Sequence, residues 1–221
     1  MRPILLLASV VVATAVLVGC EHDAPVKPVY RTTDGLIPPM PGAAAKTIAV
    51  MSFDTSKVSD ILGKTSTSIF MGVGRLTTGD YVVTNGLSME IAAAFEMQLK
   101  RAGFNVLLTP TPKPGEPPPA ADALLSGAVT DFHLSRHNRT FSFKPDDEVR
   151  GDVRFSVTLT TQDGMTVLYE GGTANARRFN KAIMLHRSTA TRTADDMLGA
   201  VIDEICKAPA FQEALRKVAG G

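Results

Sequence analysis

The chain has few cysteines and almost no net charge. Its 221 residues include only Cys20 and Cys206. If Cys20 is modified, Cys206 has no partner, so a disulfide framework is then excluded and a hydrophobic core must stabilise the protein. The formal net charge of +1 comes from Arg2, and the sequence after residue 19 is formally neutral. There is neither a basic excess to attract nucleic acid nor a long acidic tail. We therefore expect no nucleic-acid partner.

Sequence motifs of catalysis are also lacking. There is no Gly-x-Ser-x-Gly nucleophile elbow, and the Gly-rich stretch 72–75 lacks the Lys-Ser/Thr ending of a phosphate loop. His133 and His137 have a spacing that suits zinc on a helix, but here a strand is predicted and no third ligand follows at a metal-site spacing. Cys206 lies beside an apolar helical stripe and is expected to be a buried small residue. We expect no enzyme activity, cofactor or metal site.

The N-terminus, in contrast, carries an export signal. Arg2 precedes an almost wholly apolar run, residues 4–18, which has the length of a signal-peptide core and is short for a membrane span. The run ends in Leu17-Val18-Gly19-Cys20, which resembles the lipobox of bacterial lipoproteins. The resemblance implies that residues 1–19 are a cleaved signal peptide and that Cys20 carries the lipid. The alternatives are an ordinary signal peptide with an incidental cysteine and a retained single-span anchor.

The residues after Cys20 predict where the domain is held. An Asp after the lipidated cysteine resembles the inner-membrane retention signal of enteric-type bacteria, so Glu21 predicts the periplasmic face of the outer membrane. The segment 20–46 contains five prolines and no apolar periodicity, which predicts an extended lipidated tether. Residues 21–46 span at most about 90 Å when stretched and about 30 Å as a relaxed coil. The domain is therefore expected to stand off the membrane.

Residues 47–221 are predicted to form one periplasmic α+β domain. Strands are expected at 47–54, 104–109, 124–133 and 149–160, with a return strand from 165 after a turn at 162–164. Helices are expected at 87–102, after an N-cap at Thr193, and from Pro209. The order β-loop-α-β-β-β-β-α-α predicts a two-layer sandwich of a mostly antiparallel sheet with helices packed on one face.

Three features of this domain have their own interpretation. Residues 55–84 are polar and rich in Gly, Ser and Thr, which predicts a long functional or mobile loop. Residues 110–119 contain six prolines, which favours a stiff surface connector and can also suit an aromatic groove on a partner. Gly127 within a strand predicts a bulge or a close contact.

The predicted order, together with the lipobox, resembles the YajG-like lipoproteins, and more widely the auxiliary lipoproteins of ABC transport systems. The resemblance covers about residues 47–219. It is carried by the strand 48–50, the helix end 99–104, the strand 125–132, the turn at Asp163-Gly164 and the tail 211–215. The Pro-rich insertion 110–119 departs from it. The resemblance implies no enzyme activity and an accessory role in the cell envelope, in lipid or outer-membrane transport or in surface assembly.

One cluster of cations and aromatics is the candidate contact site. Basic residues near residues 136–150 and 177–181 alternate with phenylalanines, a combination that can contact anionic lipid headgroups, envelope glycans or a protein partner. The candidate residues are Arg136, Arg139, Phe141, Phe143, Arg177 and Arg178. The alternative is a solvated hairpin whose phenylalanines pack inward.

Three functions remain open from the sequence. We favour a non-enzymatic module that binds an envelope protein partner through its two irregular loops. The second hypothesis is a lipid-handling transport subunit with an apolar groove lined by Ile91, Phe95 and Leu99. A cavity at those residues would favour the second hypothesis, and a solid core would favour the first. The third is a hydrolase, which would need Ser or Asp and His converging in one cleft.

Overall fold

The computed structural model describes residues 24–32, 34–58, 61–69, 74–83, 86–138, 147–182 and 187–220. Within these ranges eight strands form one sheet in the order β1-β4-β3-β6-β2-β5, with β7 paired to β6 and β8 paired to β7. The strands are β1 (Ala24–Val26), β2 (Thr47–Met51), β3 (Ile61–Ile69), β4 (Gly74–Val83), β5 (Asn105–Thr109), β6 (Ala123–Asn138), β7 (Asp147–Thr161) and β8 (Val167–Ala182). The helices are a 3-10 turn η1 (Ala43–Ala45), α2 (Leu87–Arg101), α3 (Arg187–Lys207) and α4 (Pro209–Ala219).

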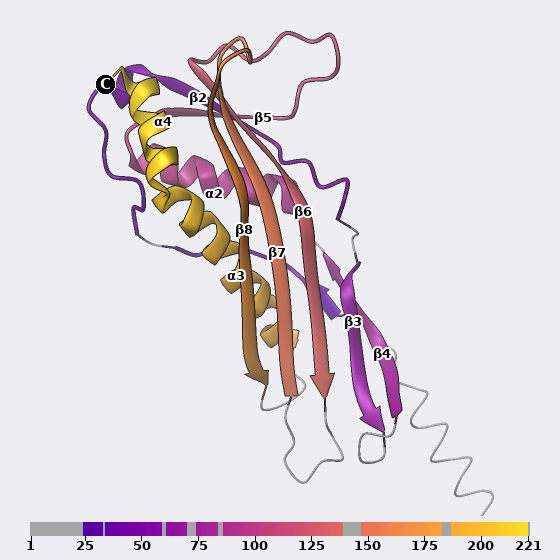
Figure 1. The fold of residues 1–221 in the computed structure, drawn as a ribbon. Helices are drawn as coiled ribbons and strands as arrows, with labels where there is room; N and C mark the ends of the chain where they lie inside the picture. The colour runs from indigo at the N-terminus through magenta and orange to yellow at the C-terminus, as the bar shows by residue number, and fades with distance from the viewer. Residues whose placement is uncertain are drawn as a thin grey trace, which may run out of the picture.

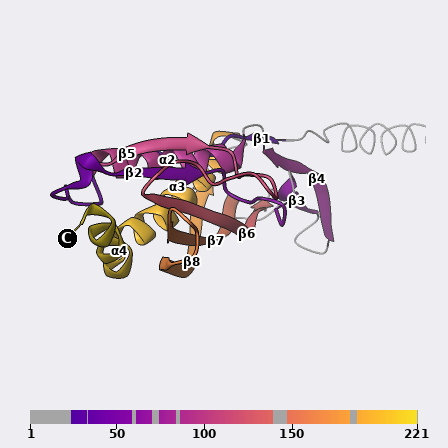
Figure 2. The ribbon, with the colours of Figure 1, turned by 90° about the horizontal axis from the view of Figure 1, so that it is seen from above.

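The predicted α+β class is confirmed, with helices packed on a mostly antiparallel sheet (Figure 1). Seen from above, α2 and α3 lie between the β2–β5 side and the β7–β8 side of the twisted sheet (Figure 2). One core of buried side chains joins these layers. None of the helices in the described ranges is long and apolar enough to cross a bilayer.

Strand β6 joins the two ends of the sheet. Near its start, Ala123–Leu125 pair in parallel with β2, and near its end, Arg136–Asn138 pair in parallel with β3. Its other edge pairs with β7 along its whole length. We call the end with the Pro-rich connection 110–121 and the β7–β8 turn the Pro-loop end. The opposite end, where β3, β6 and β8 finish and β4 and β7 begin, is called the β3–β4 end.

The alternating pattern predicted for β7 is confirmed. Val153, Phe155 and Leu159 are fully buried, whereas Arg150 and Arg154 are exposed. The predicted turn is also present: Gly164 N donates to Thr161 O at 2.8 Å. The return strand β8 continues to Ala182, well beyond the residues with a strand pattern, because it pairs with almost all of β7.

The prediction of a long loop over 55–84 is wrong. Most of this segment forms the antiparallel pair β3–β4, in which Ile69 lies opposite Gly74. β6 extends well beyond β2, so the backbone groups on that edge of its last residues would be unpaired without another strand. Thr65–Thr67 of β3 pair with Arg136–Asn138 and supply the hydrogen-bond partners. The pairing of β3 with β6 is between residues far apart in sequence, so no local alternation of apolar residues predicts it.

The segment predicted as an extended tether also differs from that prediction. We call residues 24–32 and 34–46 the N-terminal strap. β1 pairs in parallel with β4, and the strap side chains Val26, Ile37 and Met40 are buried. The physical reason is that isolated apolar residues between prolines dock singly on the helices, which needs no periodicity. Residues 1–23, including Cys20, lie outside the described residues.

The C-terminal helices match the prediction except at one boundary. The apolar stripe of α3 is buried, and Pro209 lies in the first turn of α4. Thr193, however, is not an N-cap: α3 already begins at Arg187, and the Thr193 hydroxyl donates to Thr189 O at 2.8 Å inside the helix. Cys206 is buried as predicted, and its burial raises the pKa of the thiol.

Gly127 is a close-contact point, as predicted. A Cβ added to it would overlap the Phe53 ring and the backbone carbonyl of Ser156. The Phe53 ring cannot easily move, because it stacks on Phe95 with ring centroids 5.5 Å apart. Gly127 therefore lets an aromatic ring cross β6.

Gly127→Ala should lower the free energy of unfolding by about 1–3 kcal/mol, the usual cost of overpacking a core. Urea unfolding followed by circular dichroism measures this change. Gly199→Ala is the matched control, because Gly199 is in α3 with no atom near its added Cβ. That control should be neutral or stabilise by up to about 1 kcal/mol. Equal effects of the two changes would contradict the close contact.

Candidate interaction surface

One cross-sheet row near the Pro-loop end carries no charge. Its members lie side by side on five neighbouring strands from β5 to β8: Leu107, Ala49, Leu124, Thr160 and Val167. Strands are about 4.8 Å apart, so the row is about 19 Å wide. It lies on the face opposite the main core, since Ile48 and Val50, the neighbours of Ala49, point into that core.

The middle of this row is covered and its ends are open. Ala49 and Leu124 are buried in a small second cluster with Ala121. At the two edges Leu107 is 44% exposed and Val167 is 54% exposed. Met165, in the turn next to Val167, is 83% exposed. Exposed apolar side chains therefore lie at both edges of the row, about 19 Å apart, with Met165 and Val167 together at the β8 edge.

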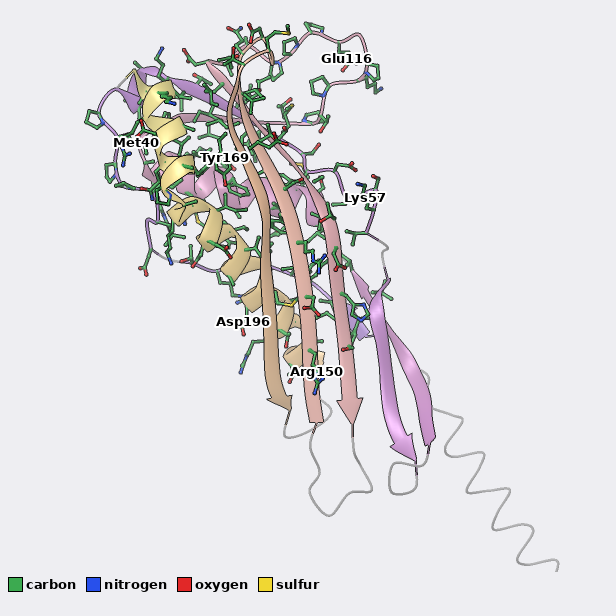
Figure 3. All side chains as sticks on the ribbon, in the orientation of Figure 1. Met40, Lys57, Glu116, Arg150, Tyr169 and Asp196 are labelled. Atoms are coloured by element: carbon green, nitrogen blue, oxygen red, sulfur yellow. The ribbon has the colours of Figure 1, made fainter. Side chains whose placement is uncertain are left out.

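The Pro-rich connection lies beside this row. Its start is held to the sheet because Thr111 N donates to Ser52 Oγ at 3.0 Å and Thr111 Oγ1 donates to Ser52 O at 2.9 Å. Its tip is a turn in which Glu116 N donates to Lys113 O, and most of its residues are exposed (Figure 3). We call Leu107, Met165, Val167 and residues 110–119 the distal apolar surface.

The turn that presents Met165 is held by an aspartate. Asp163 Oδ1 accepts hydrogen bonds from Thr161 Oγ1 at 2.6 Å and from Met165 N at 3.0 Å. These two donors lower the pKa of the Asp163 carboxyl. The side chain of Met165 is thus exposed on an ordered turn. This surface was not predicted, although the apolar residues Met165 and Val167 follow the turn signal at 163–164.

The predicted cation–aromatic cluster is only partly described. Arg139, Phe141 and Phe143 lie outside the described residues, as do the side chains of Arg136, Arg177 and Arg178. The backbone register places Arg136 opposite Val149, Arg177 opposite Asp152 and Arg178 opposite Gly151. The antiparallel pairing of β6, β7 and β8 therefore places Arg136, Arg177 and Arg178 toward the β3–β4 end. Contact with lipid, glycan or protein there stays a prediction.

Acidic positions of β7 lie between basic positions of β6 and β8. Asp152 of β7 is directly opposite His133 on one side and Arg177 on the other. Glu148 is in the same way opposite His137 and Lys181. Opposite charges at directly paired positions stabilise a sheet. The register therefore favours charge pairing across β6, β7 and β8 as one use of these basic residues.

The histidine pair does not form a metal site in this arrangement. His133 and His137 are four residues apart on the continuous strand β6, which separates them by about 13 Å. His133 is exposed. In the part of the chain that the structure describes, no group of three His, Cys, Asp or Glu side chains could hold a metal ion.

The groove proposed for lipid is filled by the core. Ile91, Phe95 and Leu99 are fully buried. Phe95 stacks on Phe53, and Phe211 of α4 packs edge-on against Phe95 with ring centroids 6.4 Å apart. These three residues therefore line a solid core and not an apolar groove.

The N-terminal strap is fastened by polar contacts to two helices. Asp195 of α3 accepts from Val29 N and from Arg31 Nε, both at 2.8 Å. Tyr30 OH donates to Asp203 at 2.9 Å. Burial, and then the bond to Asp203, raise the pKa of Tyr30. The contact is therefore fully present below pH 10, the ordinary pKa of tyrosine, and weakens only in stronger alkali.

Gln98 of α2 is the buried centre of this attachment. Its Oε1 accepts from Leu36 N at 2.9 Å, and its Nε2 donates to Tyr30 OH and Asp34 O at 3.1 Å. The amide side chain is completely buried. Its three partners all belong to the strap, so Gln98 joins the strap to the domain core.

A groove of about 710 Å³ runs between the strap and α3. Arg31, Asp195 and Asp203 are among the side chains that line it. Their charges already serve the strap, through the Arg31–Asp195 ion pair and the Tyr30–Asp203 hydrogen bond. The groove is therefore part of the strap attachment.

No protein family matches the chain by sequence, and no curated protein does. Among solved structures, a DUF330 protein from Xanthomonas campestris is similar, with a TM-score of 0.49, 9% identity and coverage of 83% of this chain and 92% of the other. A neuraminyllactose-binding hemagglutinin homolog from Helicobacter pylori has a TM-score of 0.44, 10% identity and coverage of 86% and 96%. A lipoprotein from Neisseria meningitidis has a TM-score of 0.33, 14% identity and coverage of 74% and 99%. Likenesses at this level define neither a family nor a function.

Proposed function

We propose that this chain is a lipoprotein of the outer membrane, held at the periplasmic face by lipid on Cys20, whose domain binds an envelope protein without enzyme chemistry. The lipobox at 17–20 supports the anchor, and Glu21 supports the outer membrane. The resemblance to YajG-like lipoproteins agrees with an accessory role.

The observation that carries partner binding is the distal apolar surface. Leu107, Met165 and Val167 are large apolar side chains with 44%, 83% and 54% exposure. They lie beside a proline-rich segment, whose extended backbone loses little entropy on binding. Apolar anchors next to such a segment suit a protein partner with an apolar or aromatic groove. The filled core at Phe95 argues against a lipid carrier.

Site-specific crosslinking in intact cells tests this function. A photoreactive amino acid at Val167 should form an adduct with one envelope protein, identified by mass spectrometry. The same amino acid at Lys217, an exposed position of α4, is the matched control and should form no such adduct. Met165→Asp should lower the yield from Val167 about tenfold, because a carboxylate in an apolar contact is left without a partner.

Two results would contradict partner binding. Equal adducts from Val167 and Lys217 would show collision without a specific surface. Adducts from Val167 that consist of lipid, or that are unchanged by Met165→Asp, would show that the distal apolar surface is not a protein-binding site.

A further inference from the structure

The N-terminal strap makes residue 24 a fixed point on the domain. Val26 is completely buried, and Val29, Tyr30 and Arg31 are bonded to α3. The chain from Ala24 onward therefore cannot act as a flexible spacer. Four residue steps separate Ala24 from Cys20, so at about 3.5 Å for each step the lipid is attached at most about 14 Å from Ala24.

The strand register gives the position of Ala24 along the sheet. Ala24 pairs with Tyr81 of β4, and Tyr81 pairs with Gly63 of β3. Gly63 packs directly against the backbone of Leu134 in β6. Leu134 is four residues from Asn138, the last residue of β6, which is about 13 Å along the strand. Ala24 is therefore about 13 Å from the level at which β6 ends, and about 20 Å from the end of β3 at Ile69, six residues after Gly63.

The Pro-loop end is much farther from Ala24. Gly151 of β7 is paired with Leu134 and is ten residues from Thr161, where β7 ends. That is about 33 Å along the strand. Because β1 is parallel to β4, Ala24 also faces the β3–β4 end, whereas Val26 faces the Pro-loop end. A linker of about 14 Å can reach the level at which β6 ends and cannot reach the Pro-loop end.

We infer that the bilayer carrying the Cys20 lipid is the surface against which the β3–β4 end rests, so that the distal apolar surface points away from this membrane. The inference rests on the proposed lipid anchor and deepens it. The sequence predicted a mobile domain on a tether of up to about 90 Å. In this arrangement the domain is instead held close to the bilayer with one orientation. β7 alone spans about 45–50 Å between the two ends.

The composition of the β3–β4 end suits lipid headgroups. The last eight residues of β8, 175–182, include three cations and no acidic residue. Asp147, Glu148 and Asp152 of β7 lie at the same end, and the last two are opposite Lys181 and Arg177. Cations near a membrane surface are attracted by anionic lipids over about one Debye length. The anchor supplies proximity, and the sequence at this end, which carries charges of both signs, is compatible with lipid headgroups.

Energy transfer from the protein to labelled lipid tests the orientation. The natively lipidated full chain is placed in vesicles of phosphatidylethanolamine and phosphatidylglycerol that contain a headgroup-labelled acceptor. A donor dye is attached to Arg150→Cys or to Glu116→Cys, two exposed positions toward opposite ends of the molecule (Figure 3). The buried thiol of Cys206 limits background labelling. Transfer should be several-fold greater from position 150 than from position 116.

A longer linker is the matched control. A Gly–Ser insertion of about 20 residues between Asp23 and Ala24 adds a relaxed span of roughly 25 Å. It leaves the strap intact and should make transfer from the two positions similar. Equal transfer in the chain without the insertion, with lipid on Cys20 shown by mass spectrometry, would overturn the orientation and leave the anchor standing. Absence of lipid on Cys20, with Cys20→Ser binding vesicles equally well, would overturn both.

Discussion

Replacing Phe95 with alanine should lower the free energy of unfolding by about 3–5 kcal/mol. The Phe95 side chain is fully buried and is the meeting point of several elements. Its ring stacks on Phe53, just after β2, at 5.5 Å with an angle of 1° between the planes, and Phe211 of α4 packs edge-on against it. Tyr169 of β8 extends this cluster through Phe211 at 5.1 Å. Truncation removes a large apolar area, two aromatic contacts and the packing of α2 against α4 and against the residue Phe53 after β2.

Urea unfolding at constant pH measures this loss. The chain has no Trp, so the signal is circular dichroism in the far ultraviolet. The midpoint should fall while the dependence on urea stays the same, which indicates a change of stability alone. Met89→Ala is the matched control on the same helix, because Met89 is 46% exposed, and its effect should stay within about 0.5 kcal/mol. A loss below about 1 kcal/mol for Phe95→Ala would mean that the aromatic cluster is not a packed core.

Gln98→Leu should detach the N-terminal strap and cost about 2–4 kcal/mol, from several partners each left unsatisfied. Leucine keeps most of the buried volume and removes three hydrogen bonds. Leu36 N, Asp34 O and the Tyr30 hydroxyl then lose their hydrogen bonds to the Gln98 amide. The strap can regain water for these groups only by leaving α2. The largest change is therefore expected in local opening of the strap.

Hydrogen exchange with mass spectrometry reports this opening. Amides of residues 29–37 should exchange about 10–100 times faster, while those of β7 change much less. Lys100→Leu is the control, because the side chain of Lys100 is exposed on the same helix and its described hydrogen bond is to Glu96, not to the strap. Uniform acceleration across the whole chain would indicate general destabilisation and would contradict a strap role for Gln98. In the lipidated chain, Gln98→Leu should also reduce the difference in energy transfer between positions 150 and 116.

Elements with strong local patterns were predictable. Helix α2 was expected at 87–102 and is found at Leu87–Arg101, because Ile91, Phe95 and Leu99 recur at helical spacing and Gly103 follows. Strand β7 shows strict alternation of apolar and polar residues, and that alternation is its burial pattern. In both cases the pattern of each segment already specifies the face that it buries.

Elements defined by distant partners were not predictable. β3 and β4 contain β-forming residues such as Thr, Ile, Tyr and Val, but their Gly, Ser and polar content hides any alternation. They are strands because the far end of β6 has a free edge for Thr65–Thr67. Likewise, Thr193 had the chemistry of an N-cap but lies inside a helix that starts six residues earlier.

The candidate site shows the same division. Single cations and phenylalanines could be seen in the sequence, but their opposite acids, such as Asp152 facing Arg177, are given only by strand register. The distal apolar surface also depends on the sheet, because Leu107 and Val167 are 60 residues apart in sequence and lie in one row only through β2, β6 and β7.

The sequence by itself determined the α+β class, the helix α2, the strand β7 with its turn, and the prediction of a lipid anchor at Cys20. These depend on residues close together in the chain, where periodicity and turn chemistry act directly. Only the tertiary structure decided that residues 24–32 and 34–46 form a strap, since their hydrogen-bond partners Gln98, Asp195 and Asp203 are distant in sequence. Buried isolated apolar residues and single polar contacts leave no periodic pattern in the sequence. They therefore appear only when the fold brings the partners together.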